Sequence, residues 1–163
     1  MGNVMKAKFY LLWLIMSLPA PVFAGSDGIM FHCQIENGWV DLFLDIDGVT
    51  HYVHSKSNVI DLALDNHLNA SFFKISSTML IGGGEAHIKF TNGHYDYYIY
   101  DITADVGEAA ISKSGIAVLN GGVVLDNQVC FNNANIRGEA YQRLPRFEQD
   151  FISFVYDEVR LYH

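Results

Sequence analysis

The stretch EAHIKFTNGHYDYYIYDI, residues 85–102, predicts a β-hairpin and indicates the fold class of the whole chain. In its first half apolar and polar residues alternate, so Ile88 and Phe90 share one face of a strand. Asn92-Gly93 then supplies the left-handed backbone of a tight hairpin turn. The second half leads away from that turn as a further strand, which ends near Ile102.

The same pattern extends outward from this hairpin, from residue 28 to about residue 130. Short alternating segments are separated by Asn-Gly, Asp-Gly and Gly-Gly turns, at Asn37-Gly38, Asp47-Gly48 and Gly121-Gly122 among others. We therefore expect a mainly all-β fold, an antiparallel β-barrel or sandwich of about eight short strands.

The C-terminal region has a different pattern. Residues 132–143 are polar and predict a loop. Pro145 suits the first turn of a helix, and Phe147, Phe151 and Phe154 follow helical spacing. We expect one amphipathic helix over 146–157, which would cap the sheet or, less simply, dock on a partner.

The first 24 residues are typical of a secretory signal peptide. Lys6 and Lys8 precede the apolar run 9–16, and Val22-Phe23-Ala24 ends in a small residue at the expected cleavage position. The apolar run is too short to span a bilayer. We expect cleavage after Ala24, a periplasmic protein, one β domain over 25–163 and no integral membrane segment after cleavage.

The charge of the chain limits its partners. The net charge is −8, and removal of the two lysines of residues 1–24 makes it −10. Nucleic acid and anionic membrane surfaces require basic patches, so neither is expected as a partner. A basic protein partner fits this charge, and so does simple solubility.

The two cysteines, Cys33 and Cys130, predict one disulfide, because an even count in an exported chain favours a bridge. No Cys-x-x-Cys motif is present, which favours a structural rather than a redox-active pair. The bridge would tie the first strand to the last one.

The segment 94–101, HYDYYIYD, is the candidate partner-binding element. On a strand, Tyr95 and Tyr97 share one face, and Asp96, Tyr98 and Tyr100 share the other. Tyrosines beside an acid are favoured at protein interfaces, and Glu85 adds a second acid to the candidate site. Ordinary cross-strand aromatic packing is the alternative interpretation.

No catalytic or cofactor signature is present. His51-x-x-His54 lies in a strand pattern that points the two rings to opposite faces, so no metal site is expected. Gly82-Gly83-Gly84 lacks the lysine and helix of a phosphate loop, and no nucleophile elbow occurs. We expect no cofactor and no enzyme activity. An enzyme would need a site assembled from dispersed residues, with His32, His51, His87 and His94 as candidates.

Several motifs together resemble a family of small exported bacterial β-rich proteins without assigned chemistry. They are Phe31-x-Cys33, Thr50-His51-Tyr52-Val53, Gly83-Gly84-Glu85-Ala86, Phe90-Thr91-Asn92-Gly93 and Ser114-Gly115-Ile116-x-Val118. The resemblance covers residues 28–131 and implies an exported β fold. More distantly the chain is similar to periplasmic inhibitors of C-type lysozyme, although the Trp-x-Lys-Gly element of those proteins is missing here.

These observations favour a non-enzymatic periplasmic binding protein, an inhibitor or immunity protein that blocks a cell-envelope hydrolase or a secreted toxin. The alternative is an envelope-associated β-barrel that holds a small ligand or has a structural role.

Overall fold

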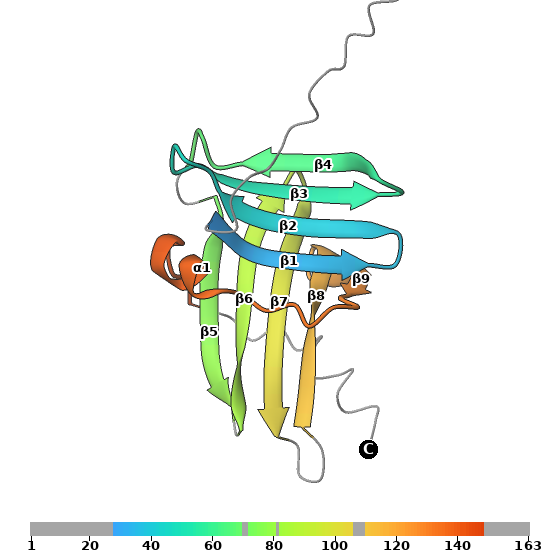
Figure 1. The fold of residues 1–163 in the computed structure, drawn as a ribbon, viewed down its shortest axis with the longest axis vertical. Coiled ribbons are helices and arrows are strands. Elements are labelled where there is room, and N and C mark those ends of the chain that lie inside the picture. The colour runs from blue at the N-terminus through green and yellow to red at the C-terminus, as the bar shows by residue number, and fades with distance from the viewer. Residues whose placement is uncertain (1–27, 70–71, 81, 106–109, 149–163) are drawn as a thin grey trace, which may run out of the picture.

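The computed structural model describes residues 28–69, 72–80, 82–105 and 110–148, and its strands form two antiparallel sheets (Figure 1). Sheet A contains, in spatial order, β1 (Ile29–Ile35), β2 (Gly38–Leu44), β3 (Thr50–Lys56) and β4 (Val59–Asp65). Sheet B contains β5 (Lys74–Leu80), β6 (Gly83–Asn92), β7 (Tyr95–Asp105), β8 (Ala110–Asn120) and β9 (Val123–Val129). The predicted antiparallel β fold is confirmed.

The two sheets pack face to face as a sandwich. Within each sheet every strand pairs with the next one along the chain, and the strands of sheet A run across those of sheet B (Figure 1). No strand of sheet A pairs with a strand of sheet B in the described part of the chain. The barrel alternative is therefore wrong and the sandwich alternative is correct, with nine described strands where about eight were expected.

The main core lies between the sheets and is rich in aromatic rings. The ring of Phe90 from sheet B lies 4.6 Å from that of Tyr52 in sheet A and 5.1 Å from that of Phe73, measured between centroids. All three side chains are almost fully buried. These rings fill the interior between the sheets, which disfavours a ligand cavity there.

Sheet B extends beyond sheet A. Strands β7 and β8 contain 11 residues each, whereas β1 contains 7, and one half of sheet B lies outside the area that sheet A covers (Figure 1). In that half the face on sheet A's side carries small or polar residues, among them Ser77, Ala86, Asp101 and Ser114. The opposite face of sheet B holds a second buried cluster, formed by Tyr98, Tyr100, Ile102, Ala117 and Leu119.

The segment 131–137 covers one edge of sheet A by running along β1. Phe131 N–H donates to the carbonyl of Gln34, and Arg137 N–H donates to that of Met30, both at 2.8 Å. The side-chain oxygen of Asn132 accepts a hydrogen bond from Gln34 N–H at 2.8 Å. The outer backbone groups of β1 are thereby partly satisfied, as edge strands require.

The segment 145–147 covers one edge of sheet B in the same manner. Ile75 N–H donates to the carbonyl of Pro145 at 2.9 Å, and Phe147 N–H donates to that of Ile75 at 3.1 Å. Arg146 thus forms a parallel bridge with Ile75 of β5. The two segments are parts of one C-terminal stretch that covers part of an edge of each sheet, at Met30 and Gln34 of β1 and at Ile75 of β5.

The disulfide predicted from the sequence is present. Cys33 in β1 is bonded to Cys130, directly after β9, and their Cα atoms lie 5.3 Å apart. Both cysteines are consumed by this bridge. The first and last strands are edges of different sheets, so the bridge joins sheet A to sheet B covalently.

The helix α1 (Gly138–Arg143) lies where the sequence predicts a loop, so the loop prediction for 132–143 is correct for 132–137 and wrong for 138–143. It has six residues and buries only Ala140, which leaves no apolar stripe to recognise in the sequence. Of the helix expected over 146–157, residues 146–148 are not helical, and 149–157 lie outside the described residues, as does the expected signal peptide. In the described ranges no helix has the length and apolar character of a membrane span.

Candidate functional site

The tyrosines of β7 share one strand but not one exposed surface. Tyr97 faces the core and stacks on Phe90 with ring centroids 4.9 Å apart, while Tyr98 and Tyr100 are buried on the other face. Tyr95, at the start of the strand, is 43% exposed. Most of the predicted tyrosine site is therefore interior packing, the alternative interpretation that the sequence left open.

The two acids of the predicted site also lie apart. Asp96 accepts a hydrogen bond from the hydroxyl of Thr91 at 2.7 Å and lies 3.2 Å from the Lys89 ammonium. Glu85 is buried, and its Oε1 lies 2.7 Å from Nε2 of the buried His87, an ion-pair distance without hydrogen-bond alignment. Only Asp96 is accessible to a partner.

Three of the four candidate histidines lie beside a carboxylate, His87 beside Glu85 as described above, and His32 and His51 beside aspartates. Nδ1 of His32 is 2.5 Å from Asp41, and Nε2 of His51 is 2.8 Å from Asp45. Within the described ranges no three His, Cys, Asp or Glu side chains come together as a metal site would require.

The edges of the two sheets differ in whether other backbone covers them, and one uncovered edge is another candidate site. Strands β1 and β5 are covered by the C-terminal stretch, whereas β4 and β9 pair on one side only among the described strands. Both of these uncovered strands carry exposed apolar side chains, Val59 and Ile60 on β4 (65% and 53% accessible) and Val123, Val124 and Leu125 on β9 (64%, 39% and 56%), but β9 also lies beside a hollow. An apolar open edge is a template for another strand.

A hollow of about 500 Å³ lies beside β9, between it and one end of sheet A. Its lining includes Ile35 and Glu36 at the end of β1, His54 and Lys56 of β3, Asp126 of β9, and Phe131. Phe131 is 70% exposed, so the apolar surface of β9 continues into this hollow. We call β9, Phe131 and this hollow the β9 side.

Two carboxylates, those of Glu36 and Asp126, line the hollow of the β9 side against one lysine. His54 Nδ1 lies 2.5 Å from Oδ1 of Asp61, so this ring nitrogen already has a carboxylate partner. Asp126 accepts a hydrogen bond from the side-chain amide of Gln128 at 2.6 Å, and Glu36 is exposed. Lys56 is the one lysine or arginine that lines the hollow.

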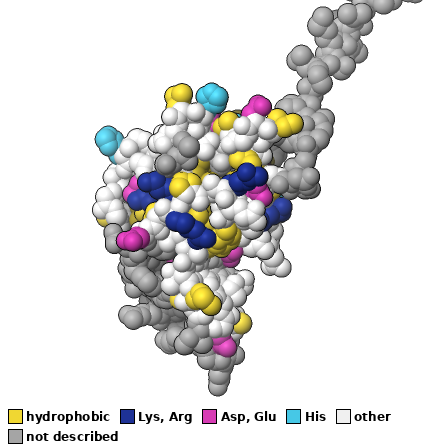
Figure 2. Space-filling model, turned by 90° about the vertical axis from the view of Figure 1, so that its left-hand side faces the viewer, with side chains coloured by type: hydrophobic (Ala, Val, Ile, Leu, Met, Phe, Trp, Pro, Cys, Tyr) yellow, Lys and Arg dark blue, Asp and Glu magenta, His cyan; other side chains and the backbone are white. Residues whose placement is uncertain are grey.

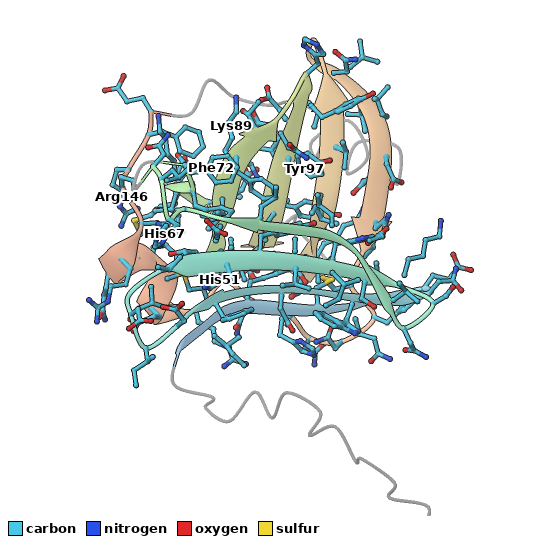
Figure 3. The ribbon with its side chains drawn as sticks, turned by 90° about the horizontal axis from the view of Figure 1, so that it is seen from above. His51, His67, Phe72, Lys89, Tyr97 and Arg146 are labelled. Carbon is cyan, nitrogen blue, oxygen red and sulfur yellow. A yellow bond between two sulfur atoms is a disulfide. The ribbon has the colours of Figure 1, made fainter. Side chains whose placement is uncertain are left out.

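Exposed cations gather at the opposite end of the molecule. Figure 2 shows lysine and arginine side chains on the side formed by β5 and α1, to which Lys74, Arg143 and Arg146 belong. Figure 3 shows Arg146 beside α1, at the end away from β9. Asp and Glu side chains lie among these cations (Figure 2), and the open edge of β9 lies away from this group.

A smaller hollow of about 300 Å³ lies beside α1, over the half of sheet B that sheet A leaves uncovered. Asp101 lies in it, and burial raises the pKa of its carboxyl although the Ile136 N–H, at 2.9 Å, acts in the opposite direction. Arg146 lies over the ring of Tyr141 and donates to the hydroxyl of Ser77 at 3.0 Å. These contacts fix the segments of Ile136, Tyr141 and Arg146 against sheet B, which is a structural role.

No protein family model matches the chain, and neither a curated protein nor a solved structure matches it. The resemblance to exported bacterial β-rich proteins and to lysozyme inhibitors thus stays a prediction.

The β9 side was not recognised as a site from the sequence. The only signal was the run Val123-Val124-Leu125, which reads equally well as an interior strand. Whether an apolar strand is an edge depends on the order of strands, which side-chain alternation does not report.

Proposed function

We propose that the chain is an exported, non-enzymatic binding protein whose β9 side docks on a partner protein and blocks it. The main support for this proposal is that the edges of the two sheets differ in whether the chain's own backbone covers them. The chain covers β1 and β5 with its own backbone and leaves apolar residues of β9 accessible, beside a hollow. Exposed apolar patches rimmed by polar groups are a common feature of interaction sites.

The charge of the protein supports a basic partner. The net charge of −8 and the acidic lining of the hollow would attract a cationic surface and accelerate its association. A cell-envelope hydrolase or a secreted toxin of basic character fits this description. The exported location rests on the sequence of residues 1–24, and the disulfide agrees with an oxidising compartment.

The test compares two variants of the full exported chain, each with added positive charge. Val123→Lys with Leu125→Lys places charge on the β9 edge, and Ile46→Lys is the matched control, because Ile46 is fully exposed in the β2–β3 turn. Each protein, immobilised with its disulfide intact, is incubated with envelope extract, and the retained protein is then assayed for loss of activity on addition of the wild-type chain.

We expect the wild type and Ile46→Lys to retain one protein of the extract that the β9 variant does not retain. We also expect the activity of that protein to fall in proportion to the amount of wild-type chain added. Retention of no protein, or equal retention by the β9 variant, contradicts the proposal.

A further inference from the structure

We infer that the partner is bound by strand addition: one of its extended segments pairs with β9, and a lysine or arginine of that segment enters the hollow. This inference rests on the proposed function and specifies how the β9 side would perform it. In strand addition main-chain hydrogen bonds supply affinity and side-chain pockets supply specificity.

The backbone of β9 provides the first half of this site. Its seven residues pair with β8 on one side, and no described strand lies along the other. The register shifts at Val118 and Leu119, which lie opposite Asp126 and Val124, so Leu125 is the extra residue of a bulge. Bulges re-aim side chains at sheet edges, and here Leu125 is 56% exposed.

The hollow provides the second half. Asp126 belongs both to β9 and to the hollow, so a strand paired with β9 would carry its side chains past this carboxylate. Glu36 offers a second carboxylate, whereas the ring of His54 is already engaged by Asp61. A guanidinium or ammonium group suits two carboxylates, and the guanidinium can bind a carboxylate through two parallel hydrogen bonds.

Charge distinguishes this occupant from two others. A second copy of the chain would bring its own net charge of −8 against the same acidic surface. The C-terminal residues 149–163 contain Asp150, Asp157 and Glu158 against the single Arg160, so they carry the same sign as the hollow. Both would meet like-charge repulsion, which a basic strand of another protein avoids.

The experiment uses synthetic peptides as probes on the full exported chain. The first peptide has about ten residues, alternates valine with threonine and carries one central lysine. The second has glutamate in place of that lysine, and the third keeps the lysine but is N-methylated at alternate residues, so that one edge of its backbone cannot donate. Binding is followed by NMR through the amide shifts and hydrogen exchange of Val123–Val129.

The lysine peptide is expected to slow amide exchange in β9, and the glutamate and N-methylated peptides to bind about tenfold more weakly or worse. Glu36→Gln with Asp126→Asn is expected to abolish the preference for lysine over glutamate and to leave strand pairing in place. Both residues are exposed, so these substitutions are compatible with folding.

Unchanged β9 amides with the lysine peptide, or equal binding of all three peptides, overturns the inference. Concentration-dependent dimerisation of the chain through β9, seen by sedimentation, also overturns it in favour of a second copy. If the peptides give one of these results but the pull-down still separates the β9 variant from Ile46→Lys, the proposed function stands while strand addition fails.

Discussion

The phenol group of Tyr100 lies directly over Gly115 of the neighbouring strand. A Cβ atom at position 115 would come within 2.5 Å of the Tyr100 hydroxyl oxygen and 2.4 Å of the carbonyl oxygen of Gln128. The same hydroxyl donates a hydrogen bond to Oδ1 of Asn127 at 2.9 Å. Glycine at 115 is therefore what allows a tyrosine on β7 to reach across β8 to β9.

We expect Gly115→Ala to lower the free energy of unfolding by about 1–3 kcal/mol, because the added methyl group overlaps a buried ring and a backbone carbonyl. Urea denaturation measures the change. Gly138→Ala is the matched control, since a Cβ atom there would meet nothing within 4 Å. Equal stability of the two variants would mean that β8 and Tyr100 are not packed in this manner.

Loss of the disulfide is expected to destabilise the protein. Cys33→Ser removes a bridge that closes a loop between residues 97 apart, and the expected loss is about 2–5 kcal/mol in free energy of unfolding. Thermal unfolding of the oxidised wild type and the variant gives the difference. The native wild-type protein should also show no reactive thiol, and labelling of two thiols would refute the bridge.

Replacement of Asp101 by asparagine is expected to stabilise the protein at neutral pH. Burial raises the pKa of this carboxyl above its ordinary value of 3.8 in the folded state. The folded protein then binds the proton more tightly than the unfolded chain, so stability falls as pH rises from about 4 through the raised pKa. Asparagine keeps an acceptor for Ile136 N–H and removes the charge.

Urea denaturation at pH 4, 5 and 7 tests this expectation. The difference in stability between Asp101→Asn and the wild type should grow in favour of the variant as the pH rises over this range. A variant that is less stable than the wild type at every pH would show that the carboxylate is needed in its charged form.

Asp45 has the opposite dependence. A hydrogen bond from His51 lowers the pKa of its carboxyl, and backbone N–H groups of Val49 and Asp47 act in the same direction. The stabilisation is present above the ordinary carboxyl pKa and is lost as pH falls through the lowered value. Asp45→Ala should therefore lose stability at pH 7 and approach the wild type in strong acid, by circular dichroism.

Asp45→Asn separates the two roles of this side chain. Its oxygen still accepts from the N–H groups of the turn, but it does not supply a charge to His51. We expect an intermediate stability at pH 7. A loss as large as that of Asp45→Ala would assign the whole effect to the histidine contact.

The hairpins could be predicted from the sequence because their signals are local. Asn37-Gly38, Asn92-Gly93 and Gly121-Gly122 all lie at or beside turns between paired strands. Alternation marked the strands wherever one face meets the core between the sheets. Alternation failed for the first half of β8. Ser112 and Ser114 lie there on the face toward sheet A but outside the area that sheet A covers, so this face does not need apolar side chains.

The candidate site could not be predicted in the same way. Coverage of β1 and β5 is made by backbone hydrogen bonds from residues far along the chain, such as Phe131 to Gln34, and these leave no trace in side-chain pattern. The tyrosines of β7 drew attention because of their composition, but the decisive quantity was their burial. Val123–Leu125 became informative only once β9 was known to be an edge.

The covering of β1 and β5 also sets an order of events during synthesis. Both covers come from residues 131–147, which leave the ribosome after every strand has emerged. A nascent or prematurely terminated chain that ends before Cys130 would have all four sheet edges open and lack the bridging cysteine. Open strand edges on incomplete chains are aggregation-prone, so residues 131–147, made after the described strands, protect parts of the chain made earlier.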